Sequence, residues 1–258
     1  TPSEPDPDAV WAALVAAVDG VGSLDGVEAC GVGSGGPMTR GGETVSPLNI
    51  PGWRDFPLRS RLADHLGLPV HVDNDAKALA LGEAWRGAAR GETDFIAMVV
   101  STGVGGGIVL DGRLLDGARG NAGHIGHVVV EPDGTPLPGH VPGVLESEAS
   151  GTAIAFRTGR PAAEAPPEEI HRAGTLVGRA VGSVANLLDL RLAVVSGSVA
   201  LGFGEPFFAA ARAEIDRVAR LDHSRGTRIV PGGLGADGPL VGAAAVAWRH
   251  RGVDVGVR

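Results

Sequence analysis

The chain of 258 residues has a formal net charge of −8, and 43% of its residues are hydrophobic, so it can fill a sizeable core in one large domain or two ordinary ones. The acidic balance and the lack of a basic run exclude the usual surface of a nucleic-acid-binding protein. The single cysteine, Cys30, cannot form an internal disulfide, and no window reaches the roughly 20 apolar residues of a membrane helix. We therefore predict a soluble, cytoplasmic protein with no nucleic-acid partner and no membrane contact.

Helices and strands are predicted to alternate from the start of the chain. After the acidic, proline-rich start TPSEPDPD, the spacing of Val10, Leu14 and Val18 indicates an amphipathic helix. The elements expected in this part are a linker over 1–8, a helix at 9–21, a strand at 27–32, a helix at 57–66, a strand at 69–73 and a helix at 75–88. The second strand runs directly into the last of these helices.

The rest of the chain continues the alternation with one hairpin. The elements expected are strands at 95–100 and 108–110 around a turn at 101–107, a strand at 127–132, a helix from 145, helices at 167–189, 203–220 and 238–250, and strands at 192–196 and 227–230. This order predicts an α/β architecture with mixed sheets.

The stretch HVDNDAKALALGEAW, residues 71–85, places an acidic cluster where a strand gives way to a helix. Asp and Asn are preferred N-cap residues, and a carboxylate there interacts favourably with the helix dipole. Asp75 would equally suit a catalytic base, because ligands of open α/β sheets gather beyond the carboxyl ends of the strands. Both roles stay open for Asp75 on this stretch alone. Lys77, the only lysine in the chain, is expected to point toward solvent rather than toward a phosphate.

Two turns rich in small residues follow predicted strands. STGVGGG, residues 101–107, connects two strands, so it is not the strand-loop-helix phosphate cradle of dinucleotide-binding or P-loop proteins. Its glycines and the Thr102 hydroxyl could still bring donors close to an anion, or the segment could be a plain hairpin turn. SGS, residues 196–198, leads from a strand toward a helix and is open to the same two interpretations.

Histidine and glutamate side chains supply a third group of candidates. His124 and His127 lie three residues apart in GHIGH, and neutral imidazoles can bind a metal or hydrogen-bond hydroxyl groups. A zinc site would need two more ligands, and the following loop offers only His140 and acidic residues. Glu146, at the start of the next helix, is either a carboxylate stabilised by the helix dipole or a residue of the pocket.

Taken in order, four segments resemble the ROK family of bacterial sugar kinases, which has the actin-like ATPase fold. They are SPLNIPGW before LPVHVDNDAKALALGEA, then STGVGGGIVLDGRLL, then GARGNAGHIGHVVVEPDG with LESEASG, and finally VVSGSVA. The resemblance runs from about Val10 to Trp248. An ordered set of this kind is far more specific than any one segment, and it implies an ATP-dependent sugar kinase.

The resemblance implies a role for each candidate residue. Asp75 matches the family's general base, which takes the proton of a sugar hydroxyl as it attacks the γ-phosphate of ATP. The matches to the sugar contacts are Gly36, Asn74, His124, His127 and Glu146. The matches to the nucleotide- and phosphate-binding turns are Thr102, Gly103, Gly105, Gly106 and Gly197.

Departures from the family pattern affect the phosphate, the metal and the sugar. No Asp-x-Gly-Gly-Thr motif precedes Ala9, so the chain is expected to lack the part that helps to place Mg²⁺ and the transferring phosphate. His124 stands where the family's glucose kinases often have Glu and its N-acetylmannosamine kinases have His, which leaves the sugar open. Lys77 replaces the family's usual Asn. The three cysteines of the family's zinc site fall at Leu137, Gly139 and Val144, so no zinc is expected although His127 is kept.

The sequence therefore predicts two α/β domains with mixed sheets flanking a cleft, in the actin-like ATPase (ribonuclease H-like) fold. Residues 1–76, joined by the helix at 238–250, are expected to form the small domain and residues 77–237 the larger one. The predicted function is phosphorylation of a hexose or N-acylhexosamine by ATP with Mg²⁺, in a homodimer. The alternative is a degenerate sugar-binding protein or sensor that transfers no phosphate. The family's repressors carry a helix-turn-helix domain that this chain does not show.

Overall fold

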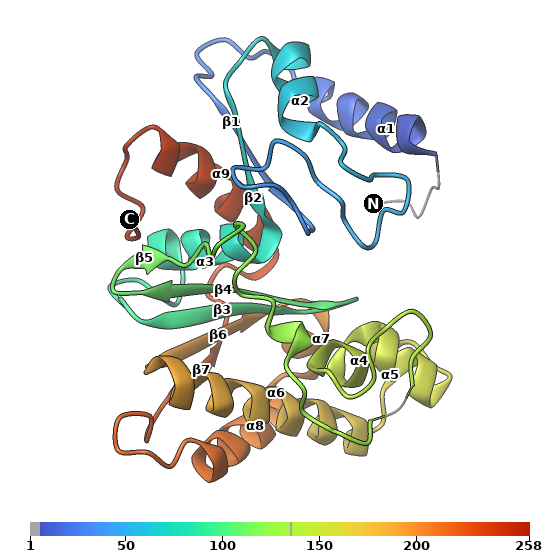
Figure 1. Cartoon of the computed structure of the whole chain (residues 1–258), viewed down its shortest axis with the longest axis vertical. Coiled ribbons are helices and arrows are strands. Elements are labelled where there is room, and N and C mark those ends of the chain that lie inside the picture. The colour runs from blue at the N-terminus through green and yellow to red at the C-terminus, as the bar shows by residue number, and fades with distance from the viewer. Residues whose placement is uncertain (1–5, 135) are drawn as a thin grey trace.

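The computed structural model describes residues 6–134 and 136–258, whose strands form two separate sheets. The strands are β1 (Cys30–Ser34), β2 (Val70–Asn74), β3 (Phe95–Val100), β4 (Val104–Leu110), β5 (Arg113–Leu114), β6 (Leu192–Ser196) and β7 (Arg228–Pro231). The helices are α1 (Pro7–Asp19), α2 (Leu58–Leu66), α3 (Asp75–Arg86), α4 (Leu145–Ala149), α5 (Gly151–Thr158), α6 (Pro167–Leu188), α7 (Ser198–Phe203), α8 (Glu205–Val218) and α9 (Gly238–His250). Figure 1 shows the smaller sheet with α1 and α2 above the larger sheet, and α3 and α9 between them.

The two sheets differ in how their strands are paired. In the smaller sheet β1 runs parallel to β2. In the larger sheet the order is β5-β4-β3-β6-β7, where β3, β6 and β7 are parallel and β4 runs antiparallel to both β3 and β5. One hairpin therefore interrupts an otherwise parallel sheet, and the predicted α/β architecture with mixed sheets is confirmed.

The larger sheet is covered on both faces. Side chains of a strand alternate between its two faces, and along β3 Phe95 and Ala97 pack with residues of α3 and α9, whereas Ile96 and Met98 pack with residues of α6 and α8. A strand buried on both faces reads as a continuous apolar run, which explains FIAMVV. A third apolar cluster lies under α1 and α2 and includes Leu62 and Val72.

Helix α9 lies against the first strands of the chain as well as against α3. A Cβ added to Gly242 would lie 2.6 Å from the carbonyl oxygen of Ala78 in α3, and a Cβ added to Gly31 would lie 1.9 Å from that of Ala243. Only glycine permits backbones to approach so closely. The last helix is therefore fixed against both β1 and α3.

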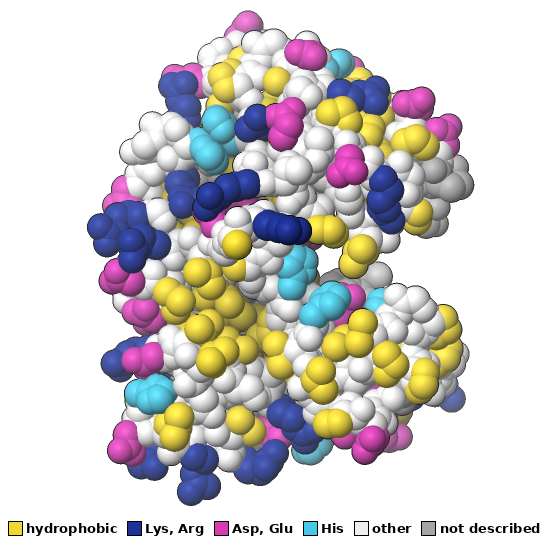
Figure 2. Space-filling view, viewed as in Figure 1, with side chains coloured by type: hydrophobic (Ala, Val, Ile, Leu, Met, Phe, Trp, Pro, Cys, Tyr) yellow, Lys and Arg dark blue, Asp and Glu magenta, His cyan; other side chains and the backbone are white. Residues whose placement is uncertain are grey.

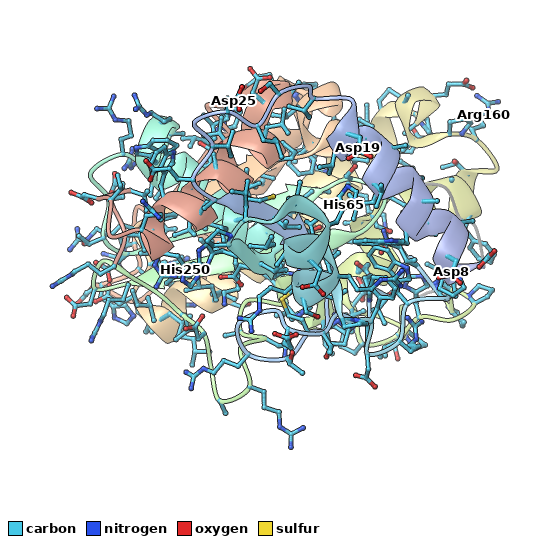
Figure 3. The ribbon with its side chains drawn as sticks, turned by 90° about the horizontal axis from the view of Figure 1, so that it is seen from above. Asp8, Asp19, Asp25, His65, Arg160 and His250 are labelled. Atoms are coloured by element: carbon cyan, nitrogen blue, oxygen red, sulfur yellow. The ribbon has the colours of Figure 1, made fainter. Side chains whose placement is uncertain are left out.

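Helix α1 is fastened to α2 at its C-terminal end. Nε2 of His65 lies 2.7 Å from Oδ1 of Asp19, and Figure 3 shows these two side chains where α1 and α2 meet. At the other end of α1, Oδ1 of Asp6 accepts the N–H of Asp8 at 3.0 Å as an N-cap. Residues 1–5 of the predicted linker lie outside the described residues.

Most predicted elements are present to within a few residues, but the segment 127–132 is not a strand. A 3₁₀ turn occupies Ile125–His127, and Val129 forms only an isolated bridge with Val144. Pro132 has no N–H with which to extend such a pairing. The β-branched run alone was therefore a misleading signal.

Three further boundaries differ from the prediction. The predicted helix 203–220 is α8, which begins at Glu205 because Gly204, with a φ of 59°, separates it from the short helix α7 that precedes it. The predicted turn 101–107 is confined to its first three residues, since β4 begins at Val104 opposite Val100. The first strand lies at 30–34 rather than 27–32. The division into domains of 1–76 with 238–250 and of 77–237 stays a prediction. Among the described residues, no helix combines the length and apolar character needed to cross a membrane.

Candidate active site

At the junction of β2 and α3, the helix cap and the candidate base are two different residues. Asn74 is the N-cap of α3, because its Oδ1 accepts the N–H groups of Ala76 at 3.0 Å and Lys77 at 3.3 Å. Asp75 is the first residue of the helix, and its Oδ1 accepts the Ala76 N–H at 2.8 Å. The cap is thus supplied by Asn74, which leaves the Asp75 carboxylate available for chemistry and the Nδ2 of Asn74 available as a donor.

Asp75 has the electrostatic environment of a base. The side chain can be reached from solvent, as a group that meets a substrate must be, but protein atoms surround it on most sides. This burial raises the pKa of Asp75, while the Ala76 N–H and the nearby His124 lower it by less. A carboxylate with a raised pKa is a stronger base at neutral pH.

His124 couples Asp75 to the other predicted sugar contacts. Burial and the neighbouring His127 lower the pKa of His124, and the charges of Asp75 and Glu146 oppose this effect. The rings of His124 and His127 lie 6.0 Å apart, edge to face. A neutral imidazole can donate one hydrogen bond and accept another. Figure 2 shows histidine side chains on the wall of the hollow between the upper and lower parts of the molecule.

Gly36 lies in the loop that follows β1, close to Asn74 and His124. A Cβ added to Gly36 would lie 3.5 Å from Nδ2 of Asn74, 3.8 Å from Oδ1 of Asn121 and 3.8 Å from Cε1 of His124. Gly36, Asn74 and His124, predicted from three separate segments, are therefore brought together. A larger side chain at this position would fill the space between them.

Asn121 belongs to the same group, and the sequence reasoning missed it. Its Oδ1 accepts the N–H of Met38 at 3.0 Å, and its Nδ2 donates to the carbonyl of Met38 at 2.9 Å. The amide thus clamps the loop before His124 to the loop that follows β1. The signal in the sequence was its place in GARGNAGHIGH, but its partner lies 83 residues away.

The turn after β3 lies against Glu146, one of the predicted sugar contacts. Oε2 of Glu146 accepts the N–H of Val104 at 2.8 Å, and a Cβ added to Gly103 would lie 2.7 Å from the same oxygen. The carbonyl of Thr102 accepts the Thr152 hydroxyl at 2.9 Å. Thr102 and Gly103 therefore lie in a turn that Glu146 and α5 hold in place.

Gly197 lies at the end of the neighbouring parallel strand. Its φ is 101°, and a Cβ there would lie 2.3 Å from the carbonyl oxygen of Val100, so the ends of β3 and β6 meet, as at the ligand-binding edge of other α/β sheets. The hydroxyls of Ser101 and Ser198, also missed from the sequence, link the two turns at 2.9 Å.

Gly105 and Gly106 lie in strand β4 rather than in the turn. A Cβ on Gly105 would lie 3.2 Å from Cβ of Ala76, and a Cβ on Gly106 would lie 2.9 Å from the carbonyl oxygen of Gly123. Their small size therefore lets β4 pack against α3 and against the loop before His124. Their role toward the nucleotide stays a prediction.

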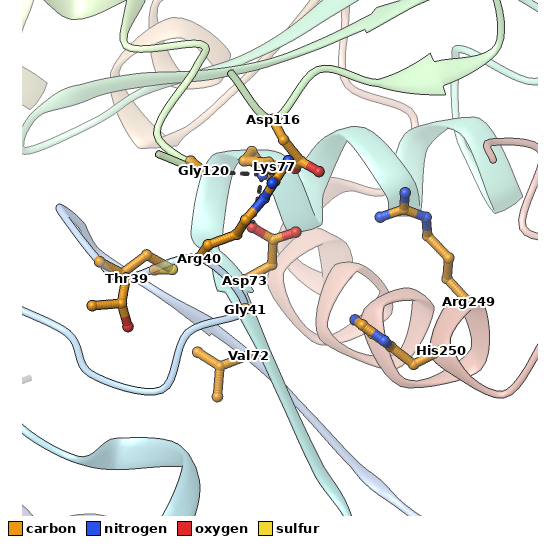
Figure 4. Close-up of a pocket in the computed structure, with 11 residues that line it drawn as sticks. Thr39, Arg40, Gly41, Val72, Asp73, Lys77, Asp116, Gly120, Arg249 and His250 are labelled. Atoms are coloured by element: carbon orange, nitrogen blue, oxygen red, sulfur yellow. Dashed lines mark hydrogen bonds and ion pairs between the residues drawn. The ribbon is translucent and has the colours of Figure 1, made fainter. Parts of the chain in front are cut away.

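Lys77 does not point to solvent, and that prediction was wrong. Its side chain is 3% exposed, and its Nζ lies 2.5 Å from Oδ1 of Asp116 and 3.1 Å from Oδ1 of Asp73. Figure 4 shows the ammonium between the two carboxylates. Asp73 precedes Lys77 by four residues, but Asp116 lies 39 residues further along the chain. The sequence around Lys77 therefore could not show that its side chain is buried.

The loop that carries the zinc ligands in the family does not fit that metal here. Leu137 and Val144 are buried hydrophobic side chains, 6% and 4% exposed, and like Gly139 they offer no donor atom. Within residues 6–134 and 136–258, no group of three or more histidine, cysteine, aspartate or glutamate side chains is placed to hold a metal. The absence of zinc from the protein stays a prediction.

Comparison with known proteins agrees with this geometry. The model of the ROK family matches residues 1–250. A glucokinase of Halalkalibacterium halodurans is 50% identical over 109 residues, 42% of this chain and 33% of that protein, and an N-acetylmannosamine kinase of Citrobacter koseri is 34% identical over 220 residues, 79% of this chain and 75% of that protein. The matches to three glucokinase and N-acetylmannosamine kinase relatives span only between 33% and 58% of their length.

The fold has counterparts among solved structures. The structure of a ROK family glucokinase from Streptomyces griseus in complex with glucose and AMPPNP superposes with a TM-score of 0.82 at 30% identity, covering 96% of this chain and 90% of that one. The predicted actin-like ATPase fold is thereby confirmed. Family match, fold and residue constellation agree, and the chain belongs to the ROK family.

Proposed function

We propose that this protein transfers the γ-phosphate of ATP to a hydroxyl of a hexose or N-acylhexosamine, with Asp75 as general base. The observation that carries the proposal is the position of Asp75, which begins α3, has a raised pKa and interacts electrostatically with His124. Its relatives' names, glucokinase and N-acetylmannosamine kinase, support the substrate class.

The proposed step moves one proton and one phosphoryl group. Asp75 takes the proton of the hydroxyl while that oxygen forms a bond to the γ-phosphorus and the bond from phosphorus to the ADP oxygen breaks. A well-positioned base contributes roughly 10²–10⁴ in rate. The Nδ2 of Asn74 and the imidazole of His124 would hold neighbouring hydroxyls, together with His127, Glu146 and the backbone at Gly36, so that the attacking oxygen is aligned with the phosphate.

The nucleotide would occupy the edge where β3 and β6 end. The N–H groups and hydroxyl of the turn at Thr102 and Gly103 are suited to phosphate oxygens, and Gly197 leaves room for the adenosine. The complex of the Streptomyces griseus relative with AMPPNP supports this class of phosphoryl donor. Mg²⁺ would enter bound to the nucleotide phosphates and neutralise charge that develops during transfer. None of the roles proposed for residues of this chain requires that residue to bind the ion.

Substitution of the base tests the proposal. Asp75→Asn in the full-length protein should lower kcat by about 10² or more while sugar binding, measured by calorimetry, stays within about threefold. Asp111→Asn is the matched control, because Asp111 is an exposed residue of the β4–β5 turn with a φ of 52° that asparagine adopts readily. Near-normal turnover of Asp75→Asn would contradict the assignment of the base.

A panel of hexoses and N-acylhexosamines with ATP and Mg²⁺ tests the substrate class. The His124 imidazole can both donate and accept a hydrogen bond. We therefore expect activity with at least one sugar of the panel whose hydroxyl or acylamino group can pair with His124. Binding of a sugar without any turnover by the full-length protein would instead favour the degenerate sensor. We expect a homodimer and a cytoplasmic location.

A further inference from the structure

We propose that Lys77 is a positioning residue for the sugar site, whose ammonium fastens the loop at 116–124 to the first turn of α3. The inference rests on the proposed function, since it concerns the same pocket. In this proposal the chain's only lysine holds sugar-binding residues in place. It neither contacts a phosphate nor serves as a solvent-exposed surface charge.

The geometry of Lys77 leaves little freedom. Its Nζ donates to Oδ1 of Asp116 at 2.5 Å and to the carbonyl of Gly120 at 3.4 Å, and it lies 3.1 Å from Oδ1 of Asp73. The ammonium thus hydrogen-bonds to two acceptors in the loop after β5 and forms an ion pair with the carboxylate of Asp73 in β2. Hydrogen bonds between charged groups are about twice as strong as neutral ones.

The acceptors would separate without the cation. Asp73 and Asp116 both place a carboxylate oxygen next to the same nitrogen, so removal of its charge leaves two like charges facing one another. Asp116 is 40% exposed and lies on a surface loop, so the loop, rather than β2, is the part free to move away.

Movement of this loop would displace sugar contacts. Gly120, whose carbonyl Lys77 holds, directly precedes Asn121, and the amide of Asn121 clamps Met38 and lies near Gly36. Four residues after Gly120 comes His124. The Lys77 ammonium therefore holds the backbone of the segment that carries both Asn121 and His124. Asp75 lies two residues before Lys77 on the same helix. It therefore stays in place with α3 when the loop moves.

A cavity beside the ion pair gives reagents a way to Lys77 when the loop opens. It has a volume of about 440 Å³, and Arg40, Arg249 and His250 line it together with Asp73 and Lys77. Figure 4 shows the Arg40 side chain reaching toward the ion pair, and Arg249 and His250 on the side of α9. While the loop is closed, the lysine side chain is almost wholly covered.

Amine labelling tests the fastening without any need for catalysis. Full-length protein is treated with an acylating amine reagent, and acylation of the peptide that contains Lys77 is followed by mass spectrometry. We expect Asp116→Asn to speed this acylation about tenfold, the factor expected for one lost charge-assisted hydrogen bond. Asp111→Asn, an equal loss of charge at an exposed turn, should leave the rate unchanged. Equal rates in wild type and Asp116→Asn would overturn the proposal.

Kinetics test the link to the sugar. Lys77→Met keeps an apolar stem without the charge, and it should raise the KM for the sugar about tenfold or more while kcat falls less. A general loss of folding would lower the melting temperature and the active fraction instead. In a double-mutant cycle, adding Asp116→Asn to Lys77→Met should raise KM little further, because both remove the same contact. Additive effects, or a change in kcat alone, would overturn the positioning role.

Protection by substrate separates this proposal from the proposed function. The sugar that the wild type phosphorylates should slow acylation of Lys77, since a bound sugar holds the loop closed. A sugar that binds without slowing acylation would contradict the link between Lys77 and the pocket. If wild type phosphorylates no sugar, the proposed function fails, whereas the comparison of wild type with Asp116→Asn still decides whether Lys77 fastens the loop.

Discussion

Gly107 in β4 determines how closely the first turn of α3 approaches the sheet. A Cβ at Gly107 would lie 2.7 Å from the carbonyl oxygen of Ala76, 2.7 Å from Cα of Lys77 and 3.0 Å from Cβ of Ala80. Carbon atoms pack at about 3.5–4.0 Å, so Gly107→Ala must push the helix start outward by roughly 1 Å. Overpacking of this kind costs about 1–3 kcal/mol, and a 1 Å displacement of a reacting group can cost about 10² in rate. We therefore expect Gly107→Ala to lower kcat about 100-fold.

The assay combines steady-state kinetics with thermal unfolding. The melting temperature should fall by several degrees, since 1 kcal/mol corresponds to about 2–4 °C in a protein of this size. The control is Gly202→Ala in α7, where an added Cβ meets no described atom within 4 Å; alanine there should stabilise the helix by up to about 1 kcal/mol. Unchanged kcat and melting temperature in Gly107→Ala would refute the reasoning that this strand sets the position of Asp75.

Three other predictions concern two carboxylates and a metal. Burial raises the pKa of Asp75 above its ordinary value of 3.8, so the folded state loses stability as the pH rises from that value through the folded pKa. Asp75→Asn should therefore unfold at a higher temperature than wild type at pH 7. This difference should vanish well below the ordinary pKa, where the carboxyl is protonated in both the folded and the unfolded state. Glu148 is fully buried with its Oε2 2.5 Å from Nη2 of Arg172, so Glu148→Ala should lower the free energy of unfolding in urea by about 3–5 kcal/mol, and a loss below about 1 kcal/mol would contradict the pair's importance. Purified protein should contain no stoichiometric zinc and should keep its melting temperature in a chelator; one tightly bound zinc per chain by elemental analysis would contradict the expectation from Leu137 and Val144.

The parts of the site that follow from local rules could be predicted from the sequence. The β2–α3 junction was found because a strand ends, a cap residue follows and an apolar helix begins within six residues, and each of these signals acts over one helical turn. The roles of Gly36, His124 and Glu146 came from the resemblance, which supplied an order of segments that periodicity alone cannot supply.

The contacts that the sequence did not reveal are all between distant segments. The burial of Lys77 depends on Asp116, and the clamp at Asn121 depends on the backbone of Met38, so no window around either residue contains its partner. In each case tertiary context outweighed a local preference.

The packing of α9 against β1 has a consequence for how the chain is made. Stacking of His71 on His250, with ring centroids 4.3 Å apart, and the contact of Gly31 with Ala243 join the small sheet to the last helix. At about 5–20 residues per second, the roughly 200 residues between β1 and α9 take on the order of 10–40 s to synthesise. Throughout that interval the small sheet is outside the ribosome without the helix that covers it, so this face of the sheet stays uncovered until α9 has been synthesised. Packing of β1 and β2 on α9 is thus delayed until that helix exists, and a release of the chain before α9 would leave this face of the first strands uncovered.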